Sequence, residues 1–192
     1  MDAFEFYFSF YGLLLGLSVA EVTNGLANAI GSRRSIQIGW LTPLLAAFFL
    51  TDVASFWMFA WGARDVIYID WSPLYVGLII AVTYYLAAAL IFPRSIAEWP
   101  SLDDHYWAHK SLVIGGIALA NAIVVGLGIA FISAPLQDPM FWFWQIIYWG
   151  PVLSLLFSKS RRLDIALLAA GVIGYLAHFV IPNSSLGDAM VG

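Results

Sequence analysis

Six long apolar runs constrain what this chain can fold into. They cover residues 6–30, 40–61, 74–92, 112–132, 141–157 and 165–181. A helix needs about 20 mostly apolar residues to cross a hydrocarbon core about 30 Å thick, and each run is close to that length. The chain is 62% hydrophobic and 10% charged, whereas a soluble domain is roughly 45–50% apolar and about 25% charged. The sequence therefore predicts an all-α integral membrane protein, a six-transmembrane-helix bundle in which residues 1–192 form a single transmembrane domain.

The basic residues predict how this bundle is oriented, because short cytoplasmic loops are enriched in Lys and Arg. The second loop holds only Arg64, and the first, third and fifth loops hold Arg33, Arg34, Arg94, Lys110, Lys159, Arg161 and Arg162. We therefore expect the odd-numbered loops in the cytoplasm and both the N-terminus and the C-terminus on the non-cytoplasmic side. This pattern indicates a multi-pass protein of a bacterial inner membrane or an equivalent membrane.

The third loop, residues 93–110, carries a pattern typical of a helix start. Ser101 is followed three residues later by Asp104, as in a capping box. Leu102, Tyr106 and Trp107 can form a face that lies along the lipid headgroups. We expect a short interfacial helix here, leading into the fourth span.

Two carboxylic acids, Glu21 and Asp52, lie within the first and second spans. An acid at the centre of a bilayer is costly and commonly marks an ion or proton pathway. At 100° per residue, Glu21, Asn24 and Asn28 share one stripe of the first helix. A neighbouring strip of small residues, which favours the close approach of another helix, consists of Gly12, Gly16 and Ala20.

Tyr84 in the third span and Asn121 in the fourth lie at a depth similar to that of the two acids. Four helices thus contribute polar groups to one midplane layer that contains no Lys or Arg. Without a basic partner, each acid must keep its proton or be solvated by water or a cation. The sequence therefore favours a proton or cation channel or transporter that uses this layer around Glu21 and Asp52. A purely structural role is the alternative, since hydrogen bonds between membrane helices contribute about 0.6 kcal/mol on average.

Two further functions stay open. The short loops and an aromatic surface with nine Trp and fourteen Phe suit an accessory or assembly subunit of a larger membrane complex. Its partners would be the lipid bilayer, further copies of the chain or other membrane subunits.

The second is an interfacial metalloenzyme using His105 and His109, with Asp104 beside them, because two imidazoles four residues apart on a helix can share a metal ion. An exposed polar turn is the alternative interpretation of these three residues. The chain has no cysteine and no phosphate-binding glycine loop or nucleophile elbow. No basic patch suited to nucleic acid is present, an enzyme is not indicated, and no cofactor is identified.

Overall fold

The computed structural model is all-helical in the residues that it describes, 3–62, 64, 70–131, 136 and 139–180. Its elements are α1 (Ala3–Gly31), α2 (Leu41–Gly62), α3 (Trp71–Ala88), the 3-10 turn η1 (Ile96–Glu98), α4 (Leu102–Phe131), α5 (Pro139–Phe157) and α6 (Arg161–Val180). Five of the helices are long and apolar enough to cross a membrane, which is typical of a multi-pass membrane protein. The prediction of an all-α protein built from membrane-length helices is confirmed.

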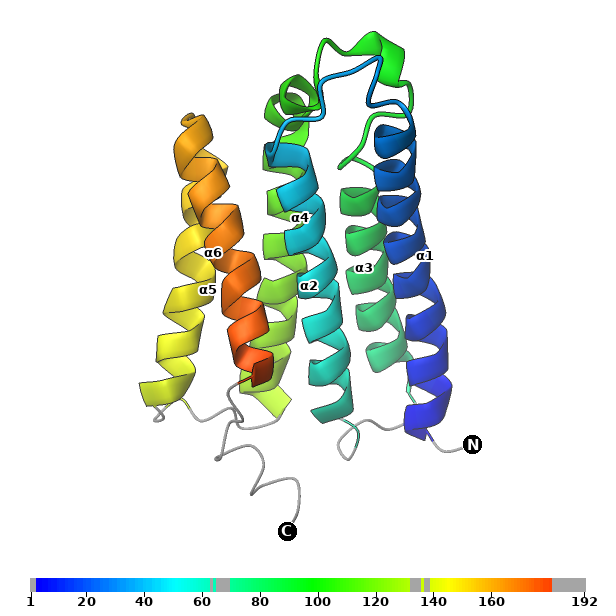
Figure 1. Ribbon diagram of the computed structural model, residues 1–192. Helices are drawn as coiled ribbons and strands as arrows, with labels where there is room; N and C mark the ends of the chain where they lie inside the picture. Colours follow the sequence, from blue (N-terminus) through cyan, green and yellow to red (C-terminus); the bar gives the residue numbers. More distant parts are fainter. Residues whose placement is uncertain (1–2, 63, 65–69, 132–135, 137–138, 181–192) are drawn as a thin grey trace.

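The helices run alternately up and down, so that the start of α1 and the end of α6 lie at the same end of the bundle (Figure 1). The connections α1–α2, α3–α4 and α5–α6 lie at the opposite end, which we call the loop end. Helix α1 packs against α2 and α3, whereas α5 packs against α4 and α6. Helices α2 and α4 are therefore central, and α1 and α5 lie at the two sides.

The third loop differs from the expected separate interfacial helix. Ser101 does begin a helix, because its Oγ accepts the Asp104 N–H at 3.1 Å and its hydroxyl donates to Asp104 Oδ2 at 2.6 Å. That helix is α4 itself, which continues without a break from Leu102 to Phe131. No Gly or Pro stands between Leu102 and Leu112 to end it.

The start of α4 fixes the start of α2 at the loop end. The Thr42 hydroxyl donates to the Leu102 carbonyl at 2.8 Å, and the Leu41 N–H donates to Asp103 Oδ1 at 3.2 Å. Asp103 Oδ2 also accepts from Arg161 at the start of α6, at 3.0 Å. One carboxylate thus joins three helices at this end and sets the depth at which α2 faces α4.

Candidate functional site

Asp52 occupies a position on α2 where the sequence spacing calls for a core residue. Leu45, Phe48, Phe49 and Phe56 lie at helical spacing on the same face and are buried, and Asp52 itself is 0% exposed. A carboxyl group in this position is costly unless hydrogen-bond donors surround it.

Four side chains supply those donors, one from each of the helices α3 to α6. Tyr84 donates to Oδ2 at 2.8 Å, and the Asn121 amide donates to both carboxylate oxygens at 3.1 and 3.0 Å. The Tyr148 hydroxyl donates to Oδ1 at 3.1 Å, and the Tyr175 hydroxyl donates to the same oxygen. We call Asp52, Tyr84, Asn121, Tyr148 and Tyr175 the Asp52 cluster. Five helices therefore meet at one carboxyl group whose four donor side chains are all uncharged.

Aromatic rings enclose the Asp52 cluster. Phe49 meets the Tyr84 ring edge-on with centroids 5.8 Å apart, and the Phe48 and Tyr175 centroids are 6.0 Å apart. The Tyr148 and Tyr175 rings also meet edge-on, at 6.1 Å. Apolar surroundings strengthen hydrogen bonds and make an unpaired polar group costly. All four donor side chains of the cluster form a hydrogen bond with the Asp52 carboxyl group.

The structure brings together three of the residues that the sequence singled out, Asp52, Tyr84 and Asn121. It leaves Glu21, Asn24 and Asn28 on the exposed side of α1. The expected layer shared by Glu21 and Asp52 is thus replaced by a cluster to which α1 contributes no side chain.

The rotation of α1 about its own axis explains this difference. The helix packs against its neighbours through the opposite side, where Leu15, Ser18 and Val22 are 0–1% exposed. In the predicted small-residue strip, a methyl group at Gly12 would meet the Trp57 ring, but a methyl group at Gly16 would meet no described residue within 4 Å. Only the first residue of that strip therefore packs within the bundle.

Sequence reasoning missed Tyr148 and Tyr175, although each lies well inside an apolar run. A phenol hydroxyl within a membrane span needs a hydrogen-bond partner, and that requirement was the available signal. The partner itself was not available from the sequence, because it lies 96 residues from Tyr148 and 123 residues from Tyr175.

A buried ion pair between α4 and α6 was also missed. Lys110 Nζ lies 2.7 Å from Asp164 Oδ2, and the two side chains are 5% and 0% exposed. Tyr106 donates to the same oxygen at 2.8 Å, and Lys110 also donates to the Ser158 carbonyl at 2.5 Å. The sequence places Lys110 in the third loop, and this prediction is wrong, because Lys110 lies inside α4 and holds the start of α6.

The candidate metal ligands do not converge. The His105 and His109 rings stack with centroids 4.2 Å apart and an angle of 20°, and Trp99 meets both rings edge-on. Imidazole nitrogens bind metals in the ring plane, so two stacked rings cannot both direct a nitrogen at one ion. Asp104 is used in the helix cap with Ser101. Among the described residues, no group of three or more His, Cys, Asp or Glu is placed to hold a metal ion.

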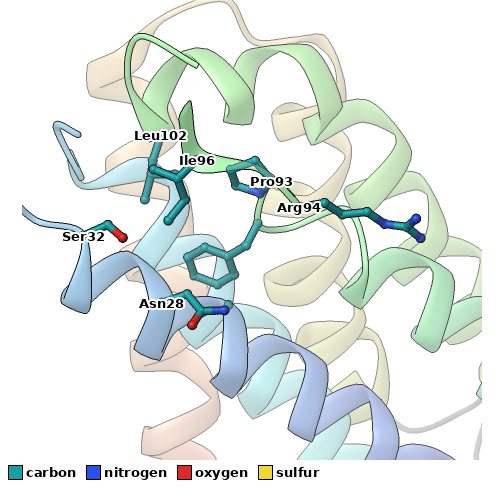
Figure 2. A pocket seen from close by; sticks show the side chains of 8 residues that line it. Asn28, Ser32, Pro93, Arg94, Ile96 and Leu102 are labelled. Atoms are coloured by element: carbon teal, nitrogen blue, oxygen red, sulfur yellow. The ribbon is translucent and has the colours of Figure 1, made fainter. Parts of the chain in front are cut away.

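An open pocket of about 220 Å³ lies at the loop end, between the end of α1 and the segment after α3. Figure 2 shows Asn28 and Ser32 on one side and Pro93, Ile96 and Leu102 on the other, with the Arg94 guanidinium extended away from them. On this side the polar side chains that line it are the Asn28 amide, near the end of α1, and the hydroxyl of Ser32, the residue after that helix. Asp52 does not line this pocket.

No family model, curated protein or solved structure matches this chain.

Proposed function

We propose that this chain is a membrane protein in which Asp52 takes up and releases a proton, as part of a proton channel or transporter. The supporting observation is the Asp52 cluster, a fully buried carboxyl group held by three phenols and one amide from four other helices. Acids within membrane bundles commonly serve proton relays and ion pathways. None of the four donor side chains carries a charge that would hold Asp52 permanently ionised.

The chemistry of the donors favours a proton over a larger cation. The Asn121 amide directs its N–H groups at both carboxylate oxygens. A metal cation beside Asp52 would therefore lie close to the partial positive charges of the amide hydrogens. A phenol hydroxyl can donate or accept. When Asp52 gains a proton, one of the three phenols can rotate to accept it while the other bonds remain. The cluster can therefore accommodate both protonation states without moving a helix.

The same cluster also fits a purely structural role, and the two interpretations differ in what a conservative change does to proton movement. Tyr84→Phe removes one hydroxyl from the cluster and keeps the ring. Tyr85→Phe is the matched control, since Tyr85 is the next residue on α3 and is 42% exposed on the outside of the bundle. A structural role predicts that neither change alters proton movement.

The test is proton flux into liposomes that contain the purified protein and a trapped pH-sensitive dye. We expect flux above that of protein-free liposomes, a several-fold reduction in Tyr84→Phe, unchanged flux in Tyr85→Phe and loss of flux in Asp52→Asn. Size-exclusion chromatography and tryptophan fluorescence confirm that each variant is folded. Wild-type flux equal to that of empty liposomes, or full flux in Asp52→Asn, would refute the proposal.

We also infer the orientation of the chain. The connections α1–α2, α3–α4 and α5–α6, which lie at the loop end of the bundle (Figure 1), carry Arg33, Arg34, Arg94 and Lys159, and Arg161 and Arg162 begin α6 directly after the last of them. Arg64 lies in the connection between α2 and α3, at the other end. The positive-inside rule supports a cytoplasmic loop end, with both termini on the opposite side of a bacterial inner membrane or its equivalent.

A further inference from the structure

The exposed face of α1 between Leu13 and Gly31 repeats with a period of seven residues. The centre line of this face, which we call the α1 seam, consists of Leu13, Leu17, Ala20, Asn24, Ala27 and Gly31, all exposed. Their spacing alternates between four and three residues, which is the spacing of the contact seam in a left-handed coiled coil. The opposite face carries the buried Leu15, Ser18, Val22 and Ala29. The bundle therefore presents a complete helix-pairing surface on its outside.

This surface is polar at a depth where lipid offers no hydrogen bonds. Glu21 lies ten residues before Gly31, which places it about 15 Å from that helix end at 1.5 Å per residue. Asn24 lies about 10 Å from the same end, so both fall within a hydrocarbon core about 30 Å thick. Neither side chain hydrogen-bonds to another residue in the part of the chain that the structure describes. An unsatisfied polar group in lipid is energetically costly, so this face requires a polar partner.

The outward face of α3 provides the contrast. Four side chains along its centre line, Tyr75, Ile79, Val82 and Leu86, are 45–59% exposed and predominantly apolar. These residues suit direct contact with lipid chains. The two neighbouring helices thus present different surfaces, and only that of α1 combines small residues with a carboxyl and amides.

We propose that the α1 seam pairs with the α1 seam of a second copy of this chain, forming a parallel dimer. Two copies inserted with the same orientation are related by a two-fold axis along the membrane normal, so their α1 helices run in the same direction. The seam is complementary to itself because Asn24 both donates and accepts hydrogen bonds. A single Asn at such a seam position is a known determinant of register in two-stranded coiled coils.

The small residues beside the seam allow the two helices to approach closely. A Cβ added at Gly16 would meet nothing within 4 Å in the described part of a single chain, and Ala20 lies one turn further along the exposed face. Small residues at this spacing permit close backbone contact between membrane helices. In a parallel pair the seven-residue repeat places Glu21 of one copy across from the partner's Gly16, where no side chain occupies the space. The carboxyl of Glu21 can then turn toward the amides of the interface and away from lipid.

The chain contains no cysteine, so single cysteines report directly on this interface. Ala20→Cys and Ala27→Cys place a thiol on the α1 seam, and Val82→Cys places one on the outward face of α3 as the matched control. Purified protein in liposomes is oxidised at increasing lipid-to-protein ratios and analysed by non-reducing electrophoresis. We expect the two seam variants to form disulfide-linked dimers at every lipid-to-protein ratio. Val82→Cys should form disulfide-linked dimers only through random collisions, so its dimer fraction should fall as lipid is added.

A second substitution tests the chemistry of the pairing. Asn24→Leu in the Ala27→Cys background should reduce the cross-linked fraction several-fold, because it removes the polar pair while keeping an apolar side chain that lipid tolerates. Seam cross-linking no greater than that of Val82→Cys would overturn the proposal. Unchanged cross-linking in the Asn24→Leu variant would also overturn it. An adduct in native membranes with the mass of this chain plus a different protein, and no dimer in liposomes, would instead assign the face to another subunit.

Discussion

The Lys110–Asp164 pair gives the sharpest prediction about stability. Lys110→Met keeps the length of the side chain but removes the ammonium group that lies 2.7 Å from Asp164 Oδ2. Asp164 stays 0% exposed and keeps the Tyr106 hydroxyl on Oδ2, while its Oδ1 already has no hydrogen-bond partner among the residues that the structure describes. Leaving one member of a buried ion pair without its partner costs about 3–5 kcal/mol. We expect Lys110→Met to lower the free energy of unfolding by that amount.

A second change should restore most of that loss. In the double variant Lys110→Met, Asp164→Asn, the buried charge is gone and the Asn carbonyl still accepts from Tyr106. The coupling energy between the two sites should therefore be at least about 2 kcal/mol, within the range measured for residues in one polar network. The matched control is Arg161→Gln, which breaks the Arg161–Asp103 pair, in which the Arg161 side chain is 55% exposed. A solvent-exposed ion pair contributes about 0–1 kcal/mol to the free energy of unfolding.

Unfolding is followed by tryptophan fluorescence as mixed micelles are titrated with dodecyl sulfate, since the chain holds nine Trp. The free energies of five proteins are compared under identical detergent conditions: the wild type, Lys110→Met, Asp164→Asn, the double variant and Arg161→Gln. If Lys110→Met loses no more stability than Arg161→Gln, or if the double variant is less stable than either single variant, the reasoning from burial is refuted.

Two further predictions concern packing and orientation. Gly77→Ala should lower the free energy of unfolding by about 1–3 kcal/mol, because a Cβ at Gly77 would lie 2.1 Å from the Tyr11 ring. Gly126→Ala, where an added Cβ would meet no described residue within 4 Å, should raise it by up to about 1 kcal/mol in the same titration. Equal effects of the two substitutions would contradict the α1–α3 packing described here. For orientation, an impermeant maleimide should label Ser72→Cys in intact cells and Ser35→Cys only after permeabilisation, and the reverse pattern would overturn the inferred topology.

Hydropathy predicted the membrane helices well because each must be apolar over a fixed length. The second predicted run, 40–61, differs by one residue at each end from the observed helix α2, Leu41–Gly62. The fourth run, 112–132, became Leu102–Phe131, because the polar residues before Leu112 form helix as readily as the apolar ones and Ser101 supplies a cap. Helix ends depend on caps and breakers, which hydropathy does not measure.

The composition of the site was harder to predict than its position. Asp52, Tyr84 and Asn121 were grouped correctly by depth, but depth does not give the rotation of a helix. Glu21 was placed with them because α1 is apolar on most sides, so its sequence does not distinguish the packed face from the outer one. The contact between α2 and α6, which brings Tyr175 to Asp52, joins residues 123 positions apart and leaves no local pattern.

The position of Asp52 has a consequence for how the protein is made. Its donors lie on α3, α4, α5 and α6, and all of them follow it in the chain. At about 5–20 residues per second, synthesis of the 123 residues between Asp52 and Tyr175 takes about 6–25 s. Throughout that interval the acid must be held by water, by the insertion machinery or by an incomplete set of partners. Completion of α6 thus supplies the last donor of the Asp52 cluster, and a chain halted before Tyr175 lacks that hydrogen bond to the buried acid.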